Sequence, residues 1–170
     1  ISRDQNVVAD LANKNKLYHS EKDRAELLMI VDLERNDLGR IAVDGTVKVD
    51  ELFLVESYAT VHHLVASITA EIAIDIDIID CIKNTFPGGS ITGAPKIRAM
   101  EIISELENFK RNIYGGGIGF LHYNKNMQIA IIIRTAFFGK GDDNNVKNVF
   151  IQSGAGIVND SIKENEYNEI

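Results

Sequence analysis

The 170-residue sequence contains one cysteine, two prolines and no tryptophan, and the single cysteine is the most restrictive of these. With Cys81 alone, the chain can form neither an internal disulfide framework nor a metal centre built from cysteines. Cys81 stands among Ile79, Ile82 and other apolar residues, which is typical of a buried, unreactive thiol. One thiol and no signal-like N-terminal segment favour a cytoplasmic protein.

Long apolar runs and basic tracts are also missing. The apolar stretches are too short to cross a bilayer, and the net charge of −7 is spread along the chain. Neither nucleic acid nor an anionic membrane is therefore an expected partner. A hydrophobic fraction of 45% is enough for one core in a single domain, and the charged fraction of 25%, with so few prolines, argues against disorder.

The two ends of the sequence resemble interior positions of a longer chain. It starts at Ile1 without a methionine, and it stops at Ile170 within a helical pattern that has no glycine cap. We therefore expect these residues to be a fragment of a longer protein.

The hydrophobic pattern predicts an α+β unit with helices packed on a largely antiparallel sheet. Helices are expected at residues 4–18, 20–37, 75–84 and 95–106, with Ser20 and Asp23 forming a capping box at the start of the second. Strands are expected at residues 46–49, 52–57, 61–72, 115–123, 127–138 and 149–153. Residues 124–126 read as a hairpin turn and residues 139–145 as a second turn. A last helix follows Ser161, which is expected to form a capping box with Glu164.

Two pairs of acidic residues lie near the two ends of the chain. Asp23 and Glu26 are three residues apart in one predicted helix, and Glu166 and Glu169 have the same spacing in another. Each pair therefore presents two carboxylates on one helix face. Carboxylate oxygens suit Mg²⁺, so the pairs could form a divalent-metal site beside an anionic substrate. The alternative is structural, with Asp23 in a helix cap and the three glutamates on solvated faces.

The segment 86–96, Phe-Pro-Gly-Gly-Ser-Ile-Thr-Gly-Ala-Pro-Lys, leads into a predicted helix. Its glycines let the backbone approach a ligand, and the helix N-terminus with Ser90, Thr92 and Lys96 offers donors to a carboxylate or a phosphate. Its spacing matches neither the P-loop nor the dinucleotide-binding fingerprint. A glycine-rich connector without a ligand is the alternative.

For several further residues, the sequence is consistent with two different roles. Gly154 and Gly156 either present backbone N–H groups to an anion or form a turn that needs positive φ. Arg134, the one charge in an apolar strand, either holds a structural acid or binds a substrate carboxylate with two hydrogen bonds. His62 and His63 point to opposite faces of their strand, so at most one of them can face a site.

In their order and spacing, these motifs resemble the C-terminal part of the chorismate-utilising enzymes. This family comprises component I of anthranilate synthase, component I of aminodeoxychorismate synthase, and the isochorismate and salicylate synthases. The resemblance implies that residues 1–170 are the C-terminal part of a chorismate-binding catalytic domain, a portion of the family's α/β sandwich. The matching stretches are residues 22–40, 61–65, 86–100, 131–135, 154–156 and 166–169.

The resemblance also implies roles for individual residues. Mg²⁺ and the ring carboxylate of chorismate would meet at Asp23, Glu26, Glu166 and Glu169. His63 would stand beside the ring, and Ser90 would provide the hydroxyl of the glycine-rich loop. The pyruvyl carboxylate would be held by Tyr114, Arg134, and the backbone of Gly154 and Gly156. From its place in the pattern alone, Tyr114 would be a core residue.

Within the family, segment 86–96 is similar to the aminodeoxychorismate synthase form, whereas anthranilate synthases more often carry an Ala-Gly-Thr form. This favours Mg²⁺-dependent amination of chorismate at C4 to 4-amino-4-deoxychorismate, for para-aminobenzoate and folate synthesis, with ammonia from a glutamine amidotransferase subunit. Anthranilate synthase component I is the alternative enzyme. A non-catalytic module that binds an anion or a metal, or that serves as an amidotransferase scaffold, is the alternative of another class.

One family segment is not found in this sequence. The family carries a Pro-Ile-Lys/Ala-Gly-Thr segment upstream of residues 20–37, and its lysine or alanine separates the two amination reactions. The strands that provide the family's general acid are also not found. We therefore expect the 170 residues alone to be inactive.

Overall fold

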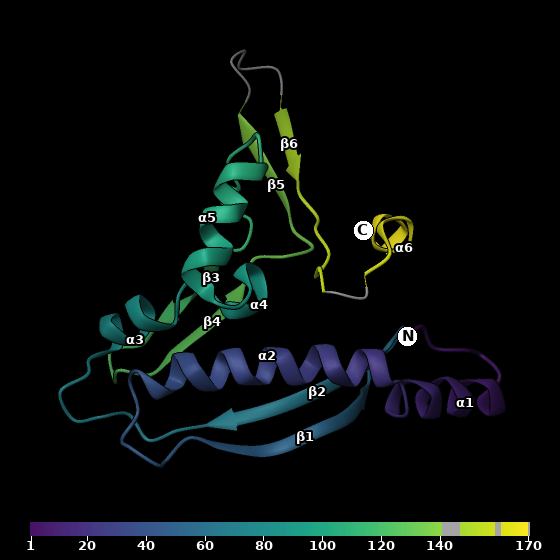
Figure 1. The fold of residues 1–170 in the computed structure, drawn as a ribbon, viewed down its shortest axis with the longest axis horizontal. Coiled ribbons are helices and arrows are strands. Elements are labelled where there is room, and N and C mark those ends of the chain that lie inside the picture. Colours follow the sequence, from purple (N-terminus) through teal and green to yellow (C-terminus); the bar gives the residue numbers. More distant parts are fainter. Residues whose placement is uncertain (141–146, 159–160, 170) are drawn as a thin grey trace. The chain divides into compact units, whose positions relative to one another are not determined.

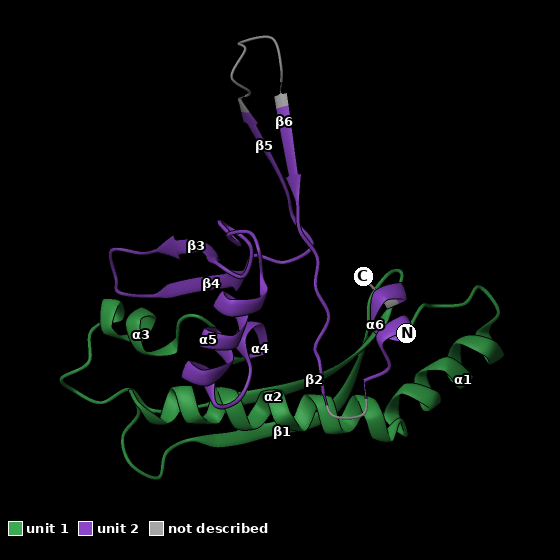
Figure 2. Cartoon of the chain, turned by 45° about the horizontal axis from the view of Figure 1, so that its top comes forward, with its two compact units in different colours: residues 1–89 green, residues 90–170 purple. Residues whose placement is uncertain are grey.

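The computed structural model describes residues 1–140, 147–158 and 161–169 (Figure 1). The chain divides into two compact units, Ile1–Gly89 and Ser90–Ile170, called unit 1 and unit 2 (Figure 2). The predicted α+β class with antiparallel strand pairing is confirmed. The described strands nevertheless form three separate two-stranded ladders and not one sheet. No helix of the described residues is long and apolar enough to cross a membrane.

Unit 1 begins with two helices that start at polar caps. Helix α1 (Val7–Tyr18) follows Asn6, whose side chain accepts hydrogen bonds from two amides of the first turn. Helix α2 (Glu21–Gly39) follows Ser20, whose hydroxyl accepts from the Asp23 N–H at 3.3 Å. These caps satisfy amides that have no partner within the helix, so each helix begins where the sequence supplies an acceptor.

The two helices cover an antiparallel ladder of strands β1 (Lys48–Ser57) and β2 (His62–Thr69). Both helices contact this ladder, with α2 running along it (Figure 1). Helix α3 (Ile78–Thr85) contacts α2 in turn. The buried apolar side chains of the described residues all belong to unit 1, and they are Leu17, Val31, Ile41 and Cys81. Burial raises the pKa of the Cys81 thiol, in agreement with the predicted unreactive cysteine.

Strand β1 corrects the prediction of two strands at residues 46–49 and 52–57. It is one strand with two register shifts, and the second shift lies between Glu51 and Leu54. There Phe53 adopts φ 62, and the Arg24 guanidinium stacks over its ring at 3.9 Å. A bulge of this kind disturbs the alternation of side chains between the two faces of a strand. Because the strands were predicted from that alternation, the bulge made one strand look like two.

Unit 2 contains two hairpins and the remaining helices. Helix α4 (Gly89–Thr92) lies across the unit boundary, within the segment that was predicted to be a loop, and α5 (Lys96–Leu106) follows Pro95. Strands β3 (Gly117–Leu121) and β4 (Met127–Ile131) form the predicted hairpin. Strands β5 (Ala136–Lys140) and β6 (Lys147–Ile151) form a second ladder, and α6 (Lys163–Glu169) ends the chain.

Two predictions for unit 2 are wrong. The strand predicted at residues 127–138 is divided into β4 and β5, because Arg134 between them adopts φ 51, outside the extended region. Helix α6 begins at Lys163, and the Ser161 hydroxyl accepts from the Val158 N–H instead of capping the helix. Most of the turn predicted at residues 139–145 lies outside the described residues.

Candidate functional site

Tyr114, one of the predicted carboxylate-binding residues, lies in a tight turn between α5 and β3. The Tyr114 N–H donates to the Arg111 carbonyl at 2.9 Å, and the Gly116 N–H donates to the Ile113 carbonyl at 3.0 Å. The same turn is joined to the end of β4, because the Gly115 N–H bonds the Ile132 carbonyl at 2.9 Å and the Ile132 N–H bonds the Gly116 carbonyl at 2.8 Å. These backbone hydrogen bonds therefore fix the position of Tyr114.

The hydroxyl of Tyr114 lies beside Gly154. A Cβ atom at Gly154 would be 2.9 Å from the Tyr114 Oη, closer than real Cβ contacts allow. A side chain at this position would displace the hydroxyl, whereas glycine leaves the phenol and the backbone free to approach the same ligand. The structure thus brings together two of the predicted substrate-binding residues. Gly156 is more open, with no atom within 4 Å of a Cβ placed there.

Arg134 occupies the break between β4 and β5, and not the middle of a strand. Its side chain is exposed, and its backbone lies in the left-handed region with φ 51. It lies two residues after Ile132, the residue that pairs with the Tyr114–Gly116 turn. An exposed guanidinium with five N–H donors suits recognition of a carboxylate better than the neutralisation of a buried acid.

The glycine-rich segment is shaped by close packing. Gly89, the first residue of α4, is buried, and a Cβ there would lie 2.6 Å from the Leu33 Cβ of α2. Ser90, the predicted substrate-binding hydroxyl, is exposed on the same short helix. Gly93 adopts φ 121, which a side chain would strain, and Pro95 leads into α5. The segment is thus a compact connection that leaves the Ser90 side chain accessible.

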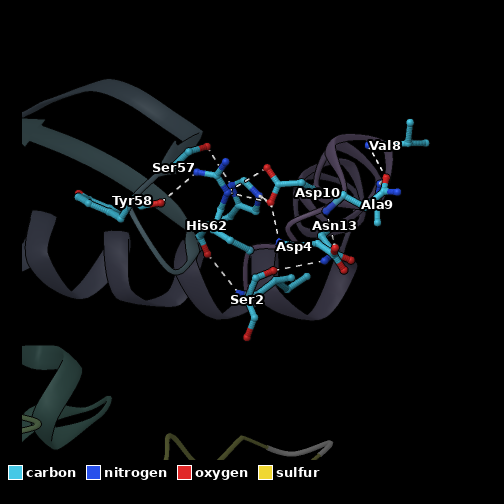
Figure 3. Close-up of polar contacts among 12 residues, drawn as sticks. Ser2, Asp4, Val8, Ala9, Asp10, Asn13, Ser57, Tyr58 and His62 are labelled. Carbon is cyan, nitrogen blue, oxygen red and sulfur yellow. Dashed lines mark hydrogen bonds and ion pairs between the residues drawn. The ribbon is translucent and has the colours of Figure 1, made fainter.

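His62 and His63 take opposite faces of β2, as predicted. His62 is 2% exposed and hydrogen-bonded on both ring nitrogens, with Nδ1 2.9 Å from the Ser57 Oγ and Nε2 3.1 Å from the Asp10 Oδ1 (Figure 3). His63 is exposed, and its ring meets that of Tyr58 edge to face, with centroids 5.8 Å apart. His63 is therefore the accessible member of the pair.

Sequence reasoning missed the network around Asp10, which fixes the start of unit 1. Its carboxylate accepts from the Arg3 Nε at 2.8 and 2.9 Å and from the Asp4 N–H at 2.9 Å (Figure 3). The hydrogen bond from Arg3 holds the pKa of Asp10 far below its ordinary value, and the pKa of Arg3 is raised in return. Long-range partners of this kind leave no mark in the sequence pattern.

The predicted metal ligands lie on two helices of different units. Asp23 and Glu26 are half-buried in the first turns of α2, and the Glu26 carboxylate is 3.6 Å from the Lys22 Nζ. Glu166 on α6 is 6% exposed, and the side chain of Glu169 lies outside the described part of the chain. Among the described residues, no group of three or more His, Cys, Asp or Glu side chains is close enough to hold a metal ion. The oxygen donors nevertheless fit Mg²⁺ by their chemistry.

Comparisons with known proteins identify a family. A family model described as chorismate binding enzyme matches residues 1–170. The chain is 54% identical over 154 residues to the aminodeoxychorismate synthase component 1 of Escherichia coli, covering 91% of this chain and 33% of that protein. It is 47% identical over 153 residues to the anthranilate synthase component 1 of Aquifex aeolicus, covering 90% of this chain and 30% of that protein.

A solved structure agrees with these sequence matches. The anthranilate synthase component I of Streptococcus pneumoniae superposes with a TM-score of 0.83 and 39% identity, covering 99% of this chain and 39% of that one. The chain therefore spans about a third of the length of the curated relatives that it matches, 33% and 30%.

Proposed function

Because this chain belongs to the chorismate binding enzymes, we propose that residues 1–170 form the C-terminal part of the catalytic domain of an aminodeoxychorismate synthase component I. The enzyme would replace the C4 hydroxyl of chorismate by an amino group from ammonia, giving 4-amino-4-deoxychorismate and water. The 54% identity to the E. coli aminodeoxychorismate synthase component 1 carries the proposal. The form of segment 86–96 supports it.

The pyruvyl carboxylate of chorismate would bind at the turn between α5 and β3. Arg134 supplies charge and paired N–H donors, Tyr114 supplies a hydroxyl, and Gly154 with Gly156 supplies backbone N–H groups. The proximity of the Tyr114 Oη to Gly154 supports this assignment. Fixing this arm of the substrate limits the motion of the ring relative to the groups that react with it.

The ring would lie near His63 and Ser90. His63 is accessible on β2, and an imidazole can accept or donate a proton close to neutral pH. Ser90 offers a hydroxyl on α4 that can donate to a substrate oxygen. Both roles are carried over from the motif resemblance of the sequence to the family.

Asp23, Glu26, Glu166 and Glu169 would be the Mg²⁺ ligands, directly or through water. A bound Mg²⁺ supplies Lewis-acid charge that neutralises the ring carboxylate and favours departure of the hydroxyl group. The support is the motif resemblance of the sequence to the family and the oxygen chemistry of the four side chains. Replacing Glu26 or Glu166 by Gln should abolish Mg²⁺ binding in calorimetry, whereas Glu101→Gln on the exposed face of α5 should leave it unchanged.

The ammonia would come from a glutamine amidotransferase subunit, because the relatives are each named as component 1 of a synthase. A cytoplasmic location is proposed from the single buried thiol, Cys81. As part of a longer enzyme, residues 1–170 alone should not turn over chorismate. Detection of turnover by the isolated 170 residues would contradict this.

Mass analysis of the product formed from chorismate, Mg²⁺ and ammonium by the whole enzyme tests the proposed reaction. A product that retains the enolpyruvyl group, as expected of a transferase, supports amination at C4. Aromatic anthranilate with free pyruvate, as expected of a lyase, would assign the enzyme to anthranilate synthase instead. This second candidate is favoured by the 47% identity to the A. aeolicus protein and by the 0.83 TM-score.

A non-catalytic role is tested separately. Calorimetric titration of Mg²⁺ and chorismate into the chain measures binding without requiring turnover. Tight binding with no product from the whole enzyme would favour a module that only binds its ligand.

A further inference from the structure

The guanidinium of Arg111 joins several segments of unit 2. Its Nε donates to the Glu107 Oε2 at 2.8 Å and its Nη2 to the Glu107 Oε1 at 2.5 Å, a two-pronged ion pair with the residue that follows α5. Its Nη1 donates to the backbone carbonyl of Ile91 in α4 at 2.9 Å. Three of its donor nitrogens are therefore committed to two different segments.

The same guanidinium also reaches the ring of Tyr114. Its central carbon is 6.0 Å from the ring centroid, at the limit of a cation–π contact. The hydroxyl of the same ring lies beside Gly154. Arg111 thus approaches the ring whose hydroxyl is assigned to the substrate.

Ile91 is held at a second point. A Cβ at Gly115 would lie 2.5 Å from the Ile91 Cγ2, so the Ile91 side chain fills the space above the glycine backbone. Its carbonyl is fixed by Arg111 and its side chain by the turn that carries Tyr114. Ser90 is the preceding residue, so the position of its backbone depends on these two contacts.

The ion pair is better suited to fixing positions than to stabilising the fold. The side chains of Arg111 and Glu107 are 25% and 28% exposed, and partly exposed ion pairs contribute little to the free energy of unfolding. The pair is nonetheless well defined by its two hydrogen bonds. These bonds lower the pKa of Glu107 and raise the pKa of Arg111. Its contacts extend to Ile91 and Tyr114.

We propose that Arg111 is a positioning residue for Tyr114, one of the residues assigned to the pyruvyl carboxylate. Its guanidinium, anchored on Glu107, holds the Tyr114 ring and the Ile91 carbonyl in place. This inference rests on the function proposed above. No atom of Arg111 needs to touch the substrate. The role requires a planar group with several donors, which lysine cannot replace.

The test measures chorismate affinity by calorimetry in the full chain with Mg²⁺ present. Arg111→Met and Arg111→Lys should each weaken binding about tenfold or more, since misplaced groups lose much of their effect. Arg98→Met is the matched control, because Arg98 pairs with Glu101 on the exposed face of α5 at 2.7 Å. It should stay within about twofold of the wild type. If Arg111→Met does not fold, as judged by circular dichroism, Arg111→Lys decides.

A double-mutant cycle shows whether Arg111 acts through Tyr114. Combining Arg111→Met with Tyr114→Phe should weaken binding hardly more than the stronger single change, because both remove the same positioned hydroxyl. Wild-type affinity in Arg111→Lys, or a double variant that loses the product of the two single effects, would overturn the proposal.

A second readout does not depend on the ligand. With ¹³C-labelled tyrosine, the Tyr114 ring resonances should shift in Arg111→Lys and stay unchanged in Arg98→Met. If the wild type bound no chorismate while these resonances shifted, the proposed function would fail and the positioning contact would stand. Unchanged Tyr114 resonances in Arg111→Lys would overturn the positioning role whatever the ligand.

Discussion

At the scale of single residues, close approach decides which side chains the candidate site can tolerate. Gly115 is buried in the turn before β3, adopts φ 71, and faces the Ile91 side chain. Gly154 faces the hydroxyl of Tyr114. Both positions need glycine for space, and Gly115 also needs it for its backbone conformation. Gly39 has neither requirement, since no atom lies within 4 Å of a Cβ placed there.

Replacing Gly115 by Ala should lower the free energy of unfolding by about 1–2 kcal/mol, because the left-handed conformation disfavours a Cβ and the added atom meets Ile91. Urea titration of the full chain measures the change. Gly39→Ala is the control, and it should leave the free energy unchanged or raise it by up to about 1 kcal/mol, as alanine is preferred in helices. A Gly115→Ala variant as stable as the wild type would show that the turn relaxes freely.

The ionisation of Asp10 should make the free energy of unfolding depend on pH in the acid range. Its pKa is lowered in the folded chain, so its contribution to stability is complete above the ordinary carboxyl pKa of about 3.9 and is lost as the pH falls below that value. Asp10→Asn should therefore be less stable than the wild type at about pH 7, and the difference should shrink towards about pH 3.

Thermal unfolding at a series of pH values measures this difference. Asp44→Asn is the control, because Asp44 is an exposed acid of unit 1 and should change the pH profile little. A constant difference between Asp10→Asn and the wild type at all pH values would mean that the ionisation of Asp10 is not the cause.

At the scale of elements, the start of α2 depends on one hydroxyl. Replacing Ser20 by Ala leaves the Asp23 N–H without its acceptor and should lower the free energy of unfolding by about 1 kcal/mol. The unfolding midpoint in urea reports it. Ser104→Ala is the control, because Ser104 is exposed inside α5, where alanine is as good a helix former or better. Equal midpoints for Ser20→Ala and the wild type would mean that water replaces the cap.

Most helices were predictable from sequence because their signals are local, whereas α4 lies in a segment that was predicted to be a loop. Asn6, Ser20 and Asp77 cap their own helices, and the apolar spacing gives their extent. The strands were less predictable, since Phe53 and Arg134 adopt positive φ without being glycine. At these two points the tertiary structure overrides local preference. As a result, two predicted strands are joined in β1 and another is divided into β4 and β5.

The assignment of the site residues stays a prediction, and the structure adds some of their contacts. The family resemblance implied one site for Tyr114 and Gly154, and the structure sets the hydroxyl of one beside the backbone of the other. Arg111 went unnoticed, because its pairing with Glu107 forms in the loop after α5, where no helical pattern draws attention to it. Its further partners, Ile91 and Tyr114, are brought to it by the chain turning back on itself, which no local pattern records.

At the scale of the whole molecule, the two units differ in how much apolar surface they cover. In unit 1, α1 and α2 contact the β1–β2 ladder, and Val31 of α2 is buried. In the described part of unit 2, no apolar side chain is buried, and Phe138 and Ile151 of the β5–β6 ladder are 68% and 73% exposed. An uncovered two-stranded ladder is marginally stable in water, because it buries little apolar surface.

Backbone amides of β2 should therefore exchange with deuterium about tenfold or more slowly than those of the described part of β5 and β6, since local opening costs least where few apolar contacts are lost. Hydrogen exchange followed by mass spectrometry or NMR measures both ladders in the same sample, so β2 serves as the internal control. Equal protection of the two ladders would mean that something covers the β5–β6 ladder in solution. If that protection fell on dilution, the cover would be a second copy of the chain, because only an intermolecular contact weakens with concentration.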